Sequence, residues 1–323
     1  MLGNKELIGH FGIGGLLQYW NEVGKKYSID SSDFDIAWLH NPFFMRRNPF
    51  ERSISTIHTT YRGSVENRIR PIAYKLVAKV IESYCYRRLP YDTRFITVSP
   101  SVSCELKGIG LCAAQVRYIQ TGVDTQRFAP ASDKASLRRR LGIQQEGTIL
   151  LAVGRLTPSK QPLELIKAFS LVAKKNSDVT LVIVGRGELL ERTRELAGRL
   201  CPGRALFMGY VDKNDLPDIY ASADYYVMSS AYEGQPATLL EAMAAGLPCI
   251  VSNIPSLEIV HEAECGISVD FKDVQRAAKA TGDYISVDNS KHARSARDYV
   301  IRNHTWRVVA EKYLDEFERA VHN

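Results

Sequence analysis

Two glutamates lie close together in a stretch that could hold a phosphorylated ligand. They are Glu233 and Glu241, in the sequence AYEGQPATLLEAMAAG at 231–246. The strand-like run DYYVMSS comes directly before this stretch. Pro236 and Gly246 are typical of the first turn and of the end of a helix. The stretch therefore predicts a loop followed by a helix.

The first turn of that helix would offer free backbone N–H groups between Gly234 and Thr238, at the positive end of the helix dipole, where phosphate binds. Glu241 would lie roughly 6 Å further along the helix axis, at 1.5 Å per residue. At that distance its carboxylate could accept hydrogen bonds from both hydroxyls of a ribose. Glu233 would face a sugar attached to the phosphate. The alternative is that both acids are solvated helix ends, with Glu233 favoured by the dipole.

A second stretch, AVGRLTPSK at 152–160, ends a strand-like run and carries two cations. Arg155 and Lys160 lie in its loop, and together they could neutralise a diphosphate leaving group. Taken alone, the loop fits a solvated pair of cations equally well. A third stretch, VGRGELL at 184–190, lacks the third glycine of a dinucleotide fingerprint because Leu190 replaces it. This argues against a nicotinamide-dependent oxidoreductase.

The elements that would position these residues are strands that alternate with helices. From Thr148 onward, short runs with apolar residues at every position are separated by helical patterns. They indicate a parallel sheet of perhaps six strands, covered on both faces, with ligands beyond the carboxyl ends of the strands. Four similar runs occur in the first half: FDIAWLH, SISTIH, RFITVS and QVRYIQTG. The sequence therefore predicts an α/β protein of two Rossmann-like domains that face a cleft, with residues 121–143 as the linker.

The end of the chain has the pattern of an amphipathic helix. Thr305 is the expected N-cap. The expected buried face carries Trp306, Val309, Ala310, Tyr313 and Phe317.

Composition argues against several classes of protein. Hydrophobic residues make up 45% of the chain, but no run approaches the roughly 20 apolar residues of a membrane span. The first residues lack the layout of a secretory signal, so we expect a cytoplasmic protein. The cysteines are scattered and form no CxxC pair. We therefore expect neither a disulfide framework nor a metal site.

Several motifs occur in the order and at the spacing of a known family. AVGRLTPSK, VIVGRGE, FMGYV, AYEGQPATLLEAMAAG and AECGISVD together resemble the donor-binding domain of the retaining glycosyltransferases of the GT-B fold, family-four type. The family's signature is a pair of glutamates separated by seven residues, which Glu233 and Glu241 match. The resemblance covers residues 148–317.

The resemblance implies a role for each matched residue. Arg155 and Lys160 would contact the nucleotide diphosphate, Glu241 the ribose hydroxyls and Glu233 the donor sugar. His58 would line the donor sugar, although without the family a histidine at such a strand end is more often structural. The predicted catalytic residues are Glu233, His58, Arg155 and Lys160. The remaining predicted donor-binding residues are Gly154, Gly185, Gly234, Gln235, Pro236, Ala237, Thr238 and Glu241.

Family members open with a strand and a Gly-Gly loop before the segment that FDIAWLHNP matches. Only 33 residues precede Phe34 in this chain, so we expect a shortened first domain whose acceptor side is incomplete. The expected units are an acceptor-side domain at 1–130, a nucleotide-sugar domain at 131–303 and a helix at 304–323 that returns to the first domain.

Charge is spread unevenly along the chain. Residues 1–146 hold 21 lysines and arginines against 13 aspartates and glutamates. Within them, 68–89 forms a basic amphipathic pattern that could lie on an anionic membrane, where lipid-linked acceptors reside. A stripe that packs against the core is the simpler interpretation and the one we prefer. Nucleic acid is not expected as a partner, because no nucleic-acid motif accompanies the charge.

We therefore expect transfer of a hexosyl group from a nucleotide-diphosphate sugar to a hydroxyl of a glycan or lipid-linked acceptor, with retention at the anomeric carbon. Beyond the donor substrate no cofactor is expected, because two side-chain cations would take the place of a metal ion. The alternatives are a catalytically weak nucleotide-sugar-binding subunit or gene fragment, and a nucleotide-sugar epimerase.

Overall fold

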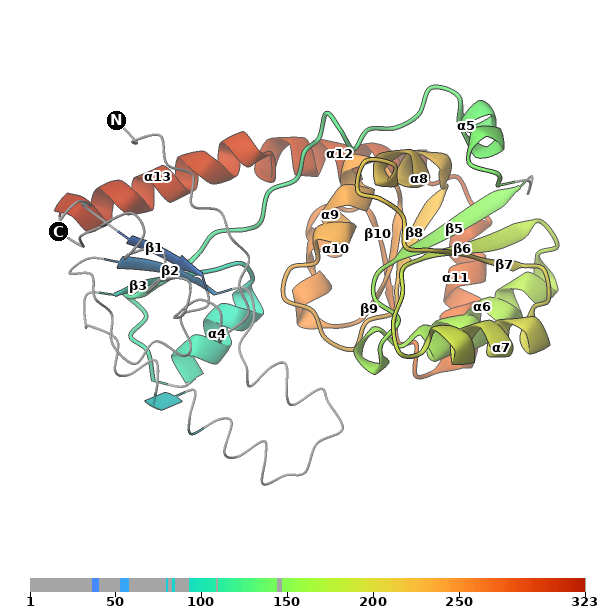
Figure 1. Cartoon of the computed structure of the whole chain (residues 1–323), viewed down its shortest axis with the longest axis horizontal. Helices are drawn as coiled ribbons and strands as arrows, with labels where there is room; N and C mark the ends of the chain where they lie inside the picture. Colours follow the sequence, from blue (N-terminus) through green and yellow to red (C-terminus); the bar gives the residue numbers. More distant parts are fainter. Residues whose placement is uncertain are drawn as a thin grey trace, which may run out of the picture.

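The protein forms two α/β units, each built on a parallel sheet (Figure 1). The computed structural model describes residues 37–40, 53–57, 80, 83–84, 93–108, 110–143 and 147–322.

The first sheet keeps its strands in chain order, and all its neighbouring pairs are parallel. Its elements are β1 (Ala37–His40), β2 (Ser53–Ile57), β3 (Arg94–Thr97), α4 (Pro100–Gly108) and β4 (Val116–Tyr118). Each strand falls within one of the four runs that the sequence predicted. The described strands thus confirm the α/β pattern of the first half.

The second sheet has six parallel strands in the order β10-β9-β8-β5-β6-β7. Its strands are β5 (Thr148–Val153), β6 (Val179–Val184), β7 (Ala205–Gly209), β8 (Tyr225–Met228), β9 (Cys249–Ser252) and β10 (Gly266–Val269). From β5 the chain moves outward through β6 to β7, then returns to the other side of β5 with β8. The strand order therefore reverses at β5, and a crevice opens beyond the carboxyl ends of β5 and β8.

Helices cover both faces of this sheet. They are α6 (Pro162–Lys175), α7 (Leu190–Leu200), α8 (Leu216–Ser222), α9 (Ala237–Ala244), α10 (Ile259–Glu262), α11 (Val274–Ile285) and α12 (Ser290–Asn303), with single 3-10 turns at Pro158–Lys160 and Pro255–Leu257. Leu150 packs with Phe169 of α6, whereas its neighbour Leu151 packs on the other face with Leu239 of α9. The burial of both is why the strands read as continuous apolar runs.

The segment expected to be a linker contains a helix, α5 (Lys134–Arg140). The Asp133 side chain caps it by accepting a hydrogen bond from the Ser136 N–H at 3.0 Å. Arg138 then joins α5 to the second unit through an ion pair with Asp224 at 2.6 Å. The polar composition of this stretch therefore reflects, over residues 134–140, a surface helix that packs on the second unit.

Helix α13 (Trp306–His322) lies along the first sheet (Figure 1). Its cap is confirmed, because Thr305 Oγ1 accepts a hydrogen bond from the Val308 N–H at 3.3 Å. Val309, Tyr313 and Phe317 pack against strands β2 and β3, as the sequence predicted. The prediction was wrong for two other positions on that face, Trp306, which is 57% exposed, and Ala310, which is also exposed.

The Trp306 ring lies over the backbone of Gly122, where an added Cβ would be 2.5 Å from it. It therefore covers the segment that follows β4 instead of entering the core.

None of the described helices is long and apolar enough to cross a bilayer. Most of the basic segment 68–89 lies outside the described residues. Two of its apolar positions are described, and they are exposed: Val80 at 69% and Tyr84 at 55%. The preferred interpretation, a stripe packed against the core, is therefore wrong at these two positions.

Candidate active site

Two loops meet at the point where the strand order of the second sheet reverses. The loop after β5 runs from Gly154 to Lys160, and the loop after β8 runs from Ser229 to Pro236. The Ala231 N–H donates to the Ser159 carbonyl at 2.8 Å, and Ser229 Oγ donates to the Lys160 carbonyl, also at 2.8 Å. These bonds fix the two loops against each other and bring together the predicted basic and acidic residues.

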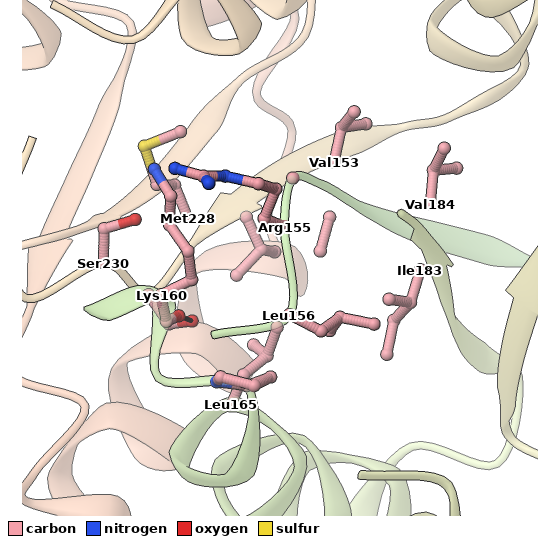
Figure 2. A pocket seen from close by; sticks show the side chains of 14 residues that line it. Val153, Arg155, Leu156, Lys160, Leu165, Ile183, Val184, Met228 and Ser230 are labelled. Atoms are coloured by element: carbon pink, nitrogen blue, oxygen red, sulfur yellow. Dashed lines mark hydrogen bonds between the residues drawn. The ribbon is translucent and has the colours of Figure 1, made fainter. Parts of the chain in front are cut away.

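A pocket opens between these loops (Figure 2). Its apolar lining comes from the ends of the sheet strands and includes Leu156, Ile183 and Val227. Its polar lining includes Arg155 and Lys160, whose side chains both extend toward the side of the pocket that carries Met228 and Ser230 (Figure 2).

The backbone at Gly185 lies directly against the backbone at Gly154. Gly185 has a positive φ of 138°, and an added Cβ would lie 1.9 Å from the Gly154 carbonyl oxygen. The absence of a side chain at Gly185 therefore lets its backbone approach the residue that follows β5. Gly154 also lines the pocket, and an added Cβ there would meet nothing within 4 Å.

Glu233 and Lys160 form an ion pair at the pocket edge. Lys160 Nζ donates to Glu233 Oε1, and Ser230 Oγ donates to the same oxygen at 2.6 Å. Glu233 is 8% exposed. The sequence predicted a cation and a carboxylate on the two loops, but not their direct contact or the hydrogen bond from Ser230.

Arg155 differs from Lys160 in that its side chain has no partner among the described residues. Its side chain is exposed and forms no hydrogen bond or ion pair with any described residue. Of the two predicted diphosphate-binding cations, one is therefore held by a carboxylate and the other is free.

Helix α9 begins beside the ion pair. Pro236 is its N-cap residue, and no side chain caps the first turn. Gly234 and Pro236 are buried, whereas Ala237 is exposed at the first helical position. The Gln235 side chain accepts a hydrogen bond from the Thr121 N–H of the chain that links the two units. This loop is therefore anchored at Gln235, and the helix dipole is directed at the region of the ion pair.

Glu241 is held on α9 by a hydrogen bond from a buried tyrosine. The Tyr220 hydroxyl donates to Glu241 Oε2 at 2.8 Å, and Tyr226 donates to Thr238 Oγ1 at 2.9 Å. Burial raises the pKa of Glu241, while the Tyr220 hydrogen bond and the charge of Arg127 act in the opposite direction. Tyr226 lies in the apolar strand run YYVM, and neither tyrosine belongs to a motif that indicates a polar role.

Two predicted features need separate mention. His58 lies outside the described residues; it follows β2 directly, at the carboxyl end of that strand. In the described part of the chain, no group of three or more His, Cys, Asp or Glu side chains could hold a metal ion.

Comparison with known proteins identifies the family of the chain. The family described as "Glycosyl transferases group 1" matches residues 133–301, and "Glycosyltransferase Family 4" matches residues 14–127. An Escherichia coli UDP-Gal:alpha-D-GlcNAc-diphosphoundecaprenol alpha-1,3-galactosyltransferase is 31% identical over 250 residues, which are 74% of this chain and 63% of that protein. The chain thus spans less than two thirds of this relative.

An uncharacterized glycosyltransferase of Methanocaldococcus jannaschii is 30% identical over 308 residues, which are 90% of this chain and 75% of that protein. Among solved structures, Anabaena HepE in complex with UDP and glucose has a TM-score of 0.76 at 18% identity, covering 96% of this chain and 84% of that one. At this identity the likeness concerns the fold alone. The chain therefore has the GT-B fold and belongs to the glycosyl transferases group 1 family.

Proposed function

We propose that the protein transfers a hexosyl group from a nucleotide-diphosphate sugar to an acceptor hydroxyl, with retention at the anomeric carbon. The observation that carries the proposal is the meeting of Arg155, Lys160 and Glu233 beside the start of α9, at the strand-order reversal. In doubly wound sheets ligands bind at this point. The name of the E. coli relative, which specifies UDP-galactose as donor, agrees with such a ligand.

In the proposed mechanism, Arg155, Lys160 and the N-terminus of α9 stabilise the diphosphate as its negative charge grows in the transition state. Preorganised cations and dipoles act most strongly at that stage. They supply the positive charge that a metal ion would otherwise bring, so we propose a metal-independent reaction. A phosphate oxygen of the leaving group accepts the proton of the attacking hydroxyl.

The other predicted residues then have positioning roles. We assign donor recognition to residues 131–303, with Glu241 on the ribose and with Glu233 and His58 on the hexose. Holding the reacting atoms in one geometry lowers the entropic part of the barrier. The turn from Gly234 to Thr238 contributes its backbone amides to the distal phosphate.

We propose a glycan or lipid-linked acceptor that the protein reaches from the cytoplasmic face of a membrane. The exposed Val80 and Tyr84 belong to the basic segment 68–89. Apolar side chains exposed between cations favour contact with an anionic surface. The E. coli relative is named for an acceptor on diphosphoundecaprenol, a lipid.

Calorimetric titration with UDP, GDP and ADP, followed by turnover measurements with the sugars of the nucleotide that binds, tests the proposal. We expect one nucleoside diphosphate to bind, and Lys160→Ala to lower kcat at least as much as it weakens donor binding. Glu318→Gln, on an exposed position of α13, is the control for a single charge change. Wild-type kcat in Lys160→Ala would remove Lys160 from the leaving-group role.

A further inference from the structure

Glu233 forms an ion pair with Lys160, one of the two cations that the proposed function assigns to the diphosphate. Its Oε1 receives two donors, Lys160 Nζ and Ser230 Oγ. The side chains of Glu233 and Lys160 are 9% and 27% exposed, so the pair is largely withdrawn from water. Glu233 Oε2 accepts no hydrogen bond from the described residues.

An ammonium group held by a buried carboxylate binds a second anion less well than a free one. The incoming phosphate must share or displace the carboxylate, and it experiences repulsion from the carboxylate at close range. Arg155 carries no such penalty, because it has no partner among the described residues. A free nucleoside diphosphate therefore gains the full attraction of Arg155 but only part of that of Lys160.

A nucleotide sugar meets the same carboxylate differently. Sugar hydroxyls donate hydrogen bonds, and a carboxylate accepts them through either oxygen. Oε2 is available for such a bond, and Ser230 keeps Oε1 in place when Lys160 turns to the phosphate. The cost of separating the ion pair is then offset by contacts that only a donor with its sugar attached can make.

We propose that Glu233 is a specificity-determining residue that acts as an internal anion on Lys160, so that the site favours the nucleotide sugar over the nucleoside diphosphate product. Once the sugar has left, the ion pair re-forms and promotes release of the diphosphate. This inference rests on the proposed function. It adds that the glutamate expected to help donor binding opposes binding of the product.

The test compares wild type with Glu233→Gln, which keeps the shape of the side chain and removes its charge. Titration with UDP, GDP and ADP is expected to show the Kd of the nucleotide that binds falling about threefold to tenfold in Glu233→Gln, as fits a partly exposed ion pair. The corresponding nucleotide sugar is expected to bind no tighter to the variant than to wild type. Glu318→Gln removes one negative charge from an exposed site on α13 and is expected to leave both affinities unchanged.

A double-mutant cycle separates this role from a structural one. In a Lys160→Ala background, Glu233→Gln is expected to bring no gain in nucleotide affinity, because the cation it would release is absent. If Glu233→Gln does not fold, Glu233→Ala, which also removes the carboxylate, takes its place with the same expected direction.

The outcomes separate this inference from the proposed function. If a nucleoside diphosphate binds wild type and binds Glu233→Gln equally or more weakly, the inference is overturned and the proposed function stands. If none of the three binds either protein, both are overturned. The inference is also overturned if Glu233→Gln still tightens nucleotide binding in the Lys160→Ala background.

Discussion

The hydroxyl of Tyr220 donates a hydrogen bond to Glu241 Oε2 across the interface of α8 and α9, at 2.8 Å. Tyr220 is completely buried, and burial raises the pKa of its phenol well above the usual value, so the hydroxyl remains a donor. Glu241 Oε1 accepts no bond from the described residues. The carboxylate is therefore fixed through one oxygen and can offer the other to a ligand.

On the proposed ribose assignment, replacing Glu241 by alanine is expected to weaken binding of the free nucleoside diphosphate by about 1 to 3 kcal/mol, because ribose hydroxyls would lose their acceptor. Calorimetric titration measures the change. The 2′,3′-dideoxy form of the same nucleotide is the control, and it should bind wild type and variant alike. If Glu241→Ala binds the ribonucleotide as tightly as wild type does, the assignment of Glu241 to the ribose is wrong.

Tyr220→Phe is expected to have a smaller effect of the same sign, about 0.5 to 1.5 kcal/mol, because the carboxylate remains but loses its fixed orientation. The loss should vanish in a Glu241→Ala background, where there is no carboxylate to orient. A loss of equal size in both backgrounds would show that Tyr220 acts through packing alone.

Gly185→Ala is expected to lower the free energy of unfolding by about 2 kcal/mol or more, because a Cβ at a φ of 138° would meet the Gly154 carbonyl oxygen at 1.9 Å. Gly198, in α7, is the matched control, because a Cβ there meets nothing within 4 Å. Gly198→Ala should instead stabilise the protein by about 0.5 to 1 kcal/mol. Denaturant titration measures the free energy of unfolding of both variants. Equal changes in Gly185→Ala and Gly198→Ala would contradict the predicted clash.

The free energy of unfolding is expected to fall as the pH is lowered, because His304 takes up a proton more readily in the unfolded chain. Burial lowers the pKa of this histidine below its usual range, with the hydrogen bond to the Thr121 carbonyl opposing and the charge of Lys312 adding to the shift. The unfolded chain takes up a proton near pH 6.5 that the folded chain does not. The contribution is therefore present above that pH and is lost as the pH falls toward the lower folded-state value.

His304→Asn removes the titrating group and keeps a donor for the Thr121 carbonyl. Unfolding free energies at pH 7.5 and pH 5.5 should differ less in this variant than in wild type. An equal difference in both would exclude His304 as a source of the pH dependence.

The sequence predicted the second sheet well because its strands are apolar on both faces. The run VTLVIV, for example, is buried at every position of β6. The end of α9 was also predictable, since Gly246 has a positive φ of 70° and its N–H bonds to the Met243 carbonyl at 3.0 Å. These features depend on neighbouring residues in the chain.

The contact between Lys160 and Glu233 could not be predicted in the same way. It depends on β5 lying next to β8, whereas the two residues are separated by 73 positions in sequence. The hydrogen bond of Tyr220 and the position of Trp306 could not be predicted for a related reason. Apolar periodicity does not reveal which acceptor a buried hydroxyl bonds or which glycine an aromatic ring covers. The environment of His58 stays a prediction, since that residue lies outside the described part of the chain.

The anomeric configuration of the first sugar product tests the central claim most directly. Wild-type protein is incubated with the α-linked sugar of the nucleotide that binds and with a prenyl-diphosphate N-acetylglucosamine acceptor. NMR then records the anomer before mutarotation, whether the hexose is transferred to lipid or to water. We predict an α product, which Arg155→Ala forms much more slowly. A β product, or a rate unaffected by Arg155→Ala, would contradict retaining transfer at this site.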